Sequence, residues 1–549
     1  MQKIITAALS SVIIFIFLCF PTWANPNSNS FFEHLRITWK TSPQTQANIS
    51  WTSRNKIADF KIHIDSLSHK GIVKSYKLTT NPQHQGTFSG SSEKAFYHHV
   101  LVKDLKASTK YYFVISSGQK VSKEYSFITA PEDYRNFTLL FGGDSRSGHR
   151  QRIEINKVIC KMHTADPNII ALAHGGDYVN KGSKWNEWDK WLSHNELLIN
   201  DNGLILPIIP AKGNHDSGPI YPQIFNIKKN EEVYFSSRLS PMAKLITLNT
   251  NGSVKGDQNN FLENALKTGT EKKTTWLLAQ YHAPLYPAVK EPNKAKSAWT
   301  SLFEKYNLTI ALEADGHCIK RTLPIRKDKH DPINGVVYVG EGGLGVGQRQ
   351  PKLDRWYLKE PGMATNGTHV MRLDFELNKL TYKVIMLDGS VKDSYIFMKN
   401  INVDPSLYKL LKPLAIQFIK NKISIKSFAE KLNKIIKDPK SDEAMKKEAS
   451  ALKENLSEHI NTKFDHFIKK ANTQPIEATE DIKLFLKTIS QLEVTSSLEK
   501  RYAELIKNDN YKSSIEIDTE IQKCLKKIKG EKMDSKKNKR HLRKSKCDD

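Results

Sequence analysis

Five short polar clusters in this chain each follow an apolar run. They combine aspartate, asparagine and histidine, whose oxygen and nitrogen atoms suit divalent or trivalent metal ions. A single Gly-Asp turn is common in any protein, but five such clusters in order along one chain predict a metal centre. The clusters are Gly-Gly-Asp144-Ser-Arg146, Gly-Gly-Asp177-Tyr-Val-Asn180, Gly213-Asn214-His215-Asp216, Tyr281-His282 and Glu313-Ala-Asp315-Gly-His317.

Residues of these types can hydrolyse a phosphate ester when they hold two metal ions about 4 Å apart. A carboxylate such as Asp177 can bridge both ions, and the neutral oxygen of Asn214 keeps the ions Lewis-acidic by limiting the negative charge. In this hypothesis a metal-bound hydroxide attacks phosphorus. His215 would protonate the leaving oxygen, Asp216 would orient or tune His215, and Arg146 would clamp a phosphate oxygen.

The apolar runs before the clusters are nearly continuous, which predicts strands that are buried on both faces. Helical patterns at 153–162 and 261–266 separate some of these runs. Because α/β proteins place their sites at the carboxyl ends of such strands, we predict an α/β catalytic domain over 133–400. The runs span 137–141, 169–173, 204–209, 276–279 and 308–312.

Residues 33–130 alternate between apolar and polar positions, which predicts an antiparallel all-β sandwich. Leu35, Ile37 and Trp39 share one face of a predicted strand. The run from Leu105 to Tyr111 resembles the turn-and-tyrosine signature of fibronectin type III modules, in which the tyrosine bonds back to the backbone. We favour a scaffold packed beside the catalytic domain over a binding module.

The first 24 residues resemble an export signal. Lys3 precedes an apolar stretch over 4–20, and Ala24 offers a small residue before a cleavage site. The sequence therefore predicts a signal peptide over 1–24 and a periplasmic or secreted protein. A retained membrane anchor is the alternative, although the stretch is short of the ~20 residues that a spanning helix needs.

Beyond residue 400 apolar residues recur at helical spacing, which predicts an all-α region over 401–525 and a basic, disordered tail over 526–549. The net charge of the chain is +26, and residues 521–549 hold twelve Lys/Arg against four Asp/Glu. Weak binding of these helices to anionic surfaces is one hypothesis, and lysine-rich solvated faces are the alternative. No specific nucleic-acid recognition and no oligomeric state are predicted. The spaced apolar residues are Leu407, Leu411, Leu414, Phe418, Phe428, Leu432, Ile435, Ile482, Leu486 and Ile489.

The ordered clusters resemble the calcineurin-like metallophosphoesterase superfamily. Together with the fibronectin-like module, they make residues 33–400 most similar to purple acid phosphatases and their bacterial relatives; the strongest motif is Lys212-Gly-Asn-His-Asp216. The resemblance implies a four-layer sandwich of two sheets flanked by helices, hydrolysis of phosphate esters, and two metal ions drawn from Fe, Mn or Zn. It also implies Asp144 and His317 as ligands of the first ion, Asp177 as the bridge, Asn214, His282 and Asp315 as ligands of the second, and His215 facing the substrate.

Three departures from the family pattern matter. Asn180 stands where purple enzymes carry an iron-binding tyrosine, so it is either a ligand or a turn residue, and we predict no tyrosinate-to-iron colour. Tyr178 lies one residue after the bridge and should point elsewhere. Asp315 replaces the first histidine of the Gly-His-x-His motif; the competing register would place Ile319, which cannot coordinate a metal, at a ligand position. Arg146 replaces a common histidine and is therefore expected either to clamp substrate or to support the ligands, not to bind a metal itself.

The sequence thus predicts an exported two-metal phosphoesterase that prefers phosphomonoesters. Two alternatives stay open at this point. One is a phosphodiesterase of the same fold, and the other is an envelope or host-surface binding protein with a vestigial metal site.

Overall fold

The computed structural model describes the chain from residue 31 to 398 except 58, 229–230, 273, 332–333, 361 and 377–378, and then 411, 414, 425–471, 479, 482–483, 486 and 495–507. The predicted signal peptide and basic tail lie outside these residues. Within the described residues, no helix combines the length and the apolar character needed to cross a bilayer.

The N-terminal region is an all-β domain, as predicted. Leu35, Ile37 and Trp39 are buried in one core. The backbone N–H of Lys106 donates to the hydroxyl of Tyr111 at 2.8 Å, which confirms the predicted tyrosine corner. The strands are β1 (Glu33–Thr38), β2 (Ala47–Ser53), β3 (Lys61–Asp65), β4 (Leu78–Thr80), β5 (His84–Thr87), β6 (Phe96–Val102), β7 (Lys110–Ser117), β8 (Lys120–Val121) and β9 (Tyr125–Ile128), with a 3-10 turn η1 (Val73–Ser75).

One sheet of this domain continues into the domain that follows. Strand β1 pairs antiparallel with β2 and parallel with β12, and Trp39 N–H donates to the carbonyl of Ile208 at 2.9 Å. The result is a ten-stranded sheet in the order β24-β23-β22-β10-β11-β12-β1-β2-β6-β5. The added strands are β10 (Phe137–Gly142), β11 (Ile169–His174), β12 (Ile208–Pro210), β22 (His369–Phe375), β23 (Lys379–Met386) and β24 (Val391–Met398).

A seven-stranded sheet packs against the ten-stranded one, because Leu139 and Phe141 share a core with Leu245, Leu278 and Leu312. Its order is β13-β14-β15-β16-β20-β17-β21. Its strands are β13 (Phe235–Ser240), β14 (Ala243–Thr247), β15 (Trp276–Gln280), β16 (Ile310–Leu312), β17 (Ile319–Arg321), β20 (Val337–Gly340) and β21 (Met363–Thr365). A small hairpin of β18 (Ile325–Arg326) and β19 (Lys329–His330) lies beside it.

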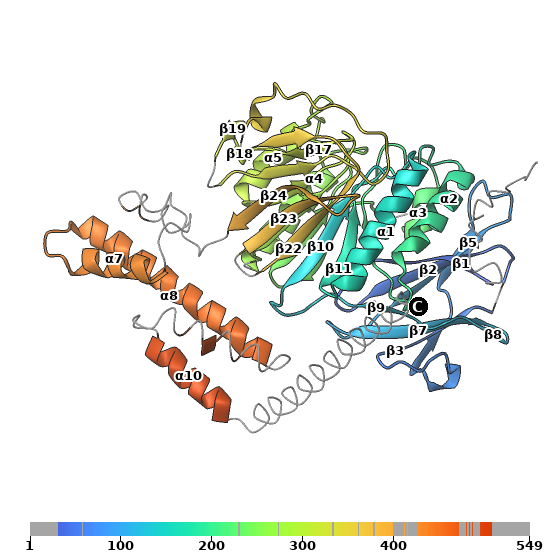
Figure 1. Ribbon diagram of the computed structural model, residues 1–549, viewed down its shortest axis with the longest axis horizontal. Helices are drawn as coiled ribbons and strands as arrows, with labels where there is room; N and C mark the ends of the chain where they lie inside the picture. Colours follow the sequence, from blue (N-terminus) through green and yellow to red (C-terminus); the bar gives the residue numbers. More distant parts are fainter. Residues whose placement is uncertain are drawn as a thin grey trace, which may run out of the picture.

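Helices cover the outer faces of the two sheets, which gives the four layers expected for the catalytic domain (Figure 1). Ile155 and Ile159 of α1 pack on Leu140 and Leu172, and Trp299 of α5 packs with Leu277 on the other side. The helices are α1 (His149–Ala165), α2 (Trp185–Asn195), α3 (Ile220–Phe225), α4 (Asp257–Glu271) and α5 (Lys296–Lys305), with 3-10 turns η2 (Glu196–Leu198) and η3 (Trp356–Leu358).

Three described helices follow residue 400, drawn in orange and red in Figure 1: α7 (Ile425–Lys437), α8 (Glu443–Ala471) and α10 (Thr495–Lys507). Phe428 and Leu432 share a separate core with Leu456 and Phe464. Leu407, Phe418 and Ile489 lie outside the described residues, so the all-helical region over 401–525 stays a prediction.

Candidate metal centre

The five polar clusters meet between the two sheets. The loops after the parallel strands β10, β11 and β12 of the large sheet carry one half of the site, and the loops after β15 and β16 of the small sheet carry the other. This arrangement follows from topology, since parallel strands end at one edge of a sheet. Asp144, Asp177 and Asn214 belong to the first half; His282, Asp315 and His317 belong to the second.

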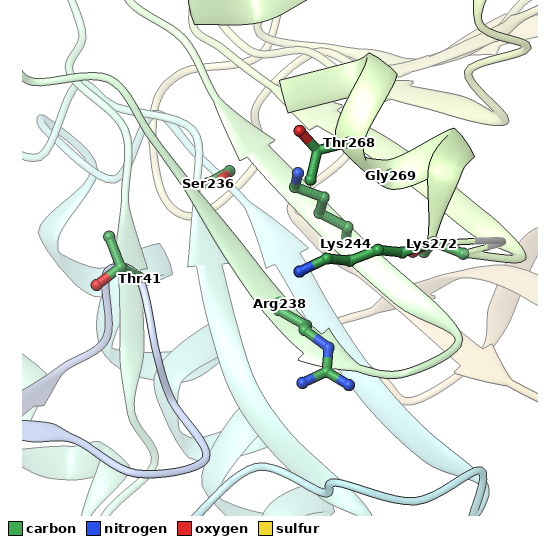
Figure 2. A pocket seen from close by; sticks show the side chains of 8 residues that line it. Thr41, Ser236, Arg238, Lys244, Thr268, Gly269 and Lys272 are labelled. Carbon is green, nitrogen blue, oxygen red and sulfur yellow. The ribbon is translucent and has the colours of Figure 1, made fainter. Parts of the chain in front are cut away.

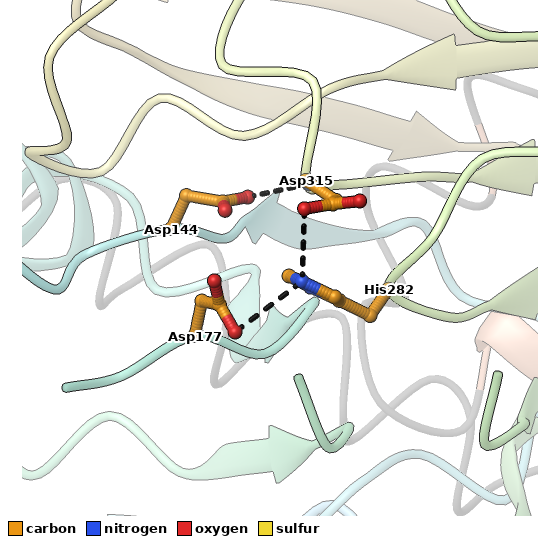
Figure 3. A group of neighbouring side chains, drawn as sticks. All are labelled: Asp144, Asp177, His282 and Asp315. Carbon is orange, nitrogen blue, oxygen red and sulfur yellow. Dashed lines mark hydrogen bonds and ion pairs between the residues drawn. The ribbon is translucent and has the colours of Figure 1, made fainter. Parts of the chain in front are cut away.

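Four of these side chains form a tight buried group, shown in Figure 3. One ligand atom from each of Asp144, Asp177, His282 and Asp315 lies within 4.8 Å of the others. His282 Nε2 is 3.3 Å from Asp177 Oδ1 and 3.5 Å from Asp315 Oδ1. The structure therefore brings residues of both halves together.

Two further predicted ligands adjoin this group. Asn214 Oδ1 lies 3.0 Å from His282 Nε2, and His317 Nε2 lies 3.3 Å from Asp144 Oδ1. With Asn214 and His317 included, six oxygen and nitrogen donors surround one small volume, which is the donor chemistry of Fe, Mn and Zn sites.

The electrostatics of the group fit cations. Asp144 Oδ1 and Asp177 Oδ2 are buried and accept no hydrogen bond within the described residues. His282 Nδ1 donates to the carbonyl of Gly175 at 2.9 Å, which leaves Nε2 as the ring atom that faces the carboxylates of Asp177 and Asp315. Burial alone would raise the pKa of Asp315, but hydrogen bonding and charge from His282, followed by Lys290, hold that pKa well below its ordinary value. Buried carboxylates that stay ionised call for positive charge beside them, and metal ions supply it.

The backbone at the ligands is sharply turned. Asp144, Asp177, Asp315 and His317 have φ values of 57°, 55°, 66° and 60°, in the left-handed region that non-glycine residues seldom occupy. Such conformations gather at functional sites, where the surrounding structure holds them in place. Gly342 lies against Asp144 in space and must be glycine, because a Cβ at this position would lie 1.9 Å from Asp144 Oδ2.

Arg146 and His215 flank the carboxylate of Asp177. Arg146 Nε lies 3.3 Å from Asp177 Oδ2, and its Nη1 donates to Asn180 Oδ1 at 2.8 Å. His215 Nδ1 donates to the carbonyl of Asn180 at 2.7 Å, and Nε2 lies 3.9 Å from Asp177 Oδ2. The His215 side chain is 33% exposed, so a substrate could reach it. Asn180 therefore accepts a hydrogen bond from Arg146 and another from His215.

The carboxylate of Asp216 accepts backbone N–H groups. Its Oδ2 accepts the backbone N–H groups of Asp177 and Gly213, each at 2.8 Å, and its Oδ1 accepts that of Tyr178 at 3.0 Å. The His215 ring is instead held by the Asn180 carbonyl. The fully buried carboxylate of Asp216 therefore shapes the loop that carries Asp177 and Asn180, and any effect of Asp216 on His215 would pass through this loop.

Tyr178 points away from the metal group, as expected. It is fully buried and stacks on His174 with ring centroids 3.9 Å apart, and its hydroxyl faces the carbonyl of His174 at 3.5 Å. The structure also favours the register that uses Asp315, because Ile319 lies in β17 and packs into the hydrophobic core.

Several residues near the ligands escaped the sequence analysis. Lys290 Nζ lies 2.5 Å from Asp315 Oδ1, and Arg349 Nη1 donates to the carbonyl of Asp315 at 3.2 Å. Both reach the site from irregular loops far along the chain, so no local pattern marked them. Lys320 and Glu341 escaped it as well, because neither stands in one of the five polar clusters.

A pocket of about 180 Å³ elsewhere on the protein is lined by basic side chains but by none of the predicted site residues (Figure 2). Lys244 Nζ donates to the carbonyl of Ala265 at 2.7 Å, near the end of α4, and Lys272 follows that helix directly. Because helix C-termini favour positive charge, the position of these lysines is explained without a ligand. Arg238 pairs with Glu132 at 2.6 Å.

A second acidic group, formed by Glu33, His34 and Asp189, already has its cation. Arg54 Nη2 pairs with Asp189 Oδ1 at 2.6 Å, and Arg54 Nε pairs with Glu33 Oε1. The guanidinium therefore supplies the positive charge that a metal would otherwise provide.

Comparison with known proteins agrees with this architecture. Residues 32–129 match the family model described as purple acid phosphatase, N-terminal domain, and residues 138–318 match that of the calcineurin-like phosphoesterases. The Fe(3+)-Zn(2+) purple acid phosphatase 12 of Arabidopsis thaliana is 23% identical over 305 residues, which cover 47% of this chain and 62% of that protein. Phosphoenolpyruvate phosphatase of Allium cepa is 22% identical, over 48% of this chain and 60% of that protein. The chain thus matches less than two thirds of the length of these relatives.

The fold has a counterpart among solved structures. Purple acid phosphatase PPD1 from yellow lupin (Lupinus luteus) seeds superposes with a TM-score of 0.57 and 17% identity, over 67% of this chain and 74% of that one. The two family models, which together match just over half of the chain, cover the N-terminal β domain and the loops from Asp144 to His317. This chain therefore belongs to the calcineurin-like metallophosphoesterases and carries an N-terminal domain of the purple acid phosphatase type.

Proposed function

We propose that this protein is an exported hydrolase of phosphate esters that works with two metal ions and prefers phosphomonoesters. The observation that carries the proposal is the meeting of two half-sites, from two different sheets, around buried carboxylate oxygens that accept no hydrogen bond among the described residues. Membership of a phosphoesterase family supports the reaction class.

The proposed ligands follow the geometry. Two bound ions would supply Lewis acidity toward phosphoryl oxygens and would acidify water at neutral pH. Asn180 is the weakest of the proposed ligands, because its carboxamide oxygen accepts a hydrogen bond from Arg146. Asp144 and His317 would hold the first ion, Asp177 would contact both, and Asn214, His282 and Asp315 would hold the second.

Two further side chains would act on the substrate. The Arg146 guanidinium, beside Asp177 Oδ2, can donate two parallel hydrogen bonds to a phosphate group. His215 keeps one proton on Nδ1, where it faces the carbonyl of Asn180, and Nε2 remains open toward the Asp177 side. A protonated Nε2 can therefore donate to the leaving oxygen of an ester.

We further propose that the N-terminal domain over 33–130 is a scaffold for the catalytic domain over 133–400. The shared ten-stranded sheet supports this role, because β1 lies directly beside β12, which precedes Asn214. Export rests on the sequence of residues 1–24, and the amino-terminal sequence of the mature protein tests it. Weak binding of anionic surfaces by the C-terminal helices is likewise a proposal, which salt-dependent binding of anionic vesicles would test.

The decisive experiment measures hydrolysis of an aryl phosphomonoester and the matching aryl diester with added Mn, Fe, Zn or Mg. Asp177→Asn should lower kcat by about a thousandfold, because several kcal/mol of charge stabilisation is lost. Asp65→Asn is the matched control, since Asp65 is also a buried aspartate, lies in the N-terminal domain and pairs with His69.

The outcomes separate the alternatives. Faster turnover of the diester would make the protein a phosphodiesterase of the same fold. Folded, metal-loaded protein that turns over neither ester would contradict the proposal and favour a binding protein.

A further inference from the structure

Beneath the second half of the metal centre lies a fully buried ion triad. Lys320, Glu313 and Glu341 are each 0% exposed. Lys320 Nζ pairs with Glu313 Oε2, lies 2.8 Å from Glu341 Oε1, and donates to the carbonyl of Tyr286 at 2.8 Å. The three donors of the ammonium group therefore have three acceptors.

The triad ties down the loop that carries His282. Glu313 Oε1 accepts the Tyr281 hydroxyl at 2.8 Å and the Leu285 N–H at 2.6 Å. Glu341 Oε1 accepts the Ala288 N–H at 2.6 Å. With the bond from Lys320 to Tyr286, this loop is anchored on both sides of His282.

The triad also fixes the loops of the other ligands. Glu313 stands two residues before Asp315, and the Glu341 carbonyl accepts the His317 N–H at 2.6 Å. Packing is so close that a Cβ on Gly316 would lie 1.6 Å from Glu341 Oε2. Three segments of the chain thus meet at one lysine.

A buried ion triad contributes little net stability compared with a well-packed apolar core, because removing charges from water costs as much as their attraction returns. Its effect here is on geometry. We propose that Lys320 is a positioning residue, which holds the loops of His282, Asp315 and His317 in their metal-binding arrangement before any metal arrives. This inference rests on the metal site of the proposed function but not on its reaction.

The first test is amide hydrogen exchange of the full chain after removal of metals with a chelator. The amides of Leu285, Ala288 and His317 should remain protected, within about tenfold of the metal-loaded protein. Exchange at the rate of unstructured chain until metal is added would overturn the proposal.

The second test separates the lysine bridge from its charge. In Lys320→Met/Glu313→Gln the triad keeps its net charge of one negative, but the bridge is lost. Zn²⁺ and Mn²⁺ affinity, measured by competition with a chelator, should fall about 10–100-fold, as for other residues that orient metal ligands. Affinity equal to that of the wild type in the folded variant would overturn the proposal.

Arg321→Met is the matched control. Arg321 is the next residue of β17 and pairs with Asp393 at 2.8 and 2.9 Å, away from the ligands. Its loss should change metal affinity by less than about twofold, since distant sites act independently. Should the double variant fail to fold, exchange in the wild-type chain decides alone. Neither test needs turnover, so a failure of hydrolysis and a failure of positioning are told apart.

Discussion

The two halves of the metal centre are held by different means. In the first half, Asp216 gathers the backbone N–H groups of Asp177, Tyr178 and Gly213 around one carboxylate. In the second half, buried ion pairs between Lys320 and two glutamates, Glu313 and Glu341, hold the loops. The first network is local to two loops, whereas the second joins segments around residues 285, 313, 320 and 341. Substitutions should therefore affect the two halves differently.

The largest effect should come from the charged half. Lys320→Met leaves two glutamates buried without their cation, so the free energy of unfolding should fall by about 3–5 kcal/mol. Urea unfolding measures this loss. A loss no larger than that of Asp216→Ala would show that the charged half is not the more sensitive of the two.

The first half should be less sensitive. Asp216→Ala removes the acceptor of three buried N–H groups and should cost about 3 kcal/mol in urea unfolding, while Asp216→Asn, which keeps one acceptor oxygen, should cost less. Equal losses for the two variants would contradict the assignment of all three N–H groups to Asp216.

This contrast explains what the sequence could predict. The candidate ligands were predictable because each follows a buried strand, and parallel topology gathers such positions at one edge. Asp216 was found by its motif, but its contacts with backbone N–H groups were not predicted, since its spacing does not reveal whether it faces a side chain or the backbone. The triad was missed because Glu313, Lys320 and Glu341 become neighbours only when β16, β17 and β20 pair. The fusion of the two domains into one sheet was missed for the same reason: only the parallel pairing of β1 with β12 shows it.

The contact between the N-terminal domain and η2 should depend on pH. Glu196 accepts the His34 N–H at 2.7 Å, and burial raises its pKa to about 7. The folded protein therefore keeps a proton that the unfolded chain releases near pH 4.5. Stability should fall as pH rises from about 4.5 to 7, by at most about 3 kcal/mol.

Urea unfolding of the wild type and of Glu196→Gln at pH 5 and pH 7.5 measures this contribution. The variant should lose less stability between the two pH values. Parallel losses in both proteins would show that Glu196 does not carry the effect.

The smallest effect concerns Tyr178, which packs behind the first half. Tyr178→Phe should change stability by less than about 1 kcal/mol, because the hydroxyl lies 3.5 Å from its acceptor and so makes a long, weak hydrogen bond. Iron-loaded protein should show no purple absorption band in either form. A band that disappears in the variant would mean that Tyr178 reaches the metal after all.

The central claim is that the two halves form one centre for two ions. Calorimetric titration of chelator-treated protein with Zn²⁺ and with Mn²⁺ tests it most directly, using the wild type and Asp177→Asn. We expect two ions per chain in the wild type and weakened binding of both in the variant, since Asp177 faces both halves. Binding of a single ion would contradict a centre shared between the two sheets. So would binding of two ions whose affinities are the same in the wild type and in Asp177→Asn.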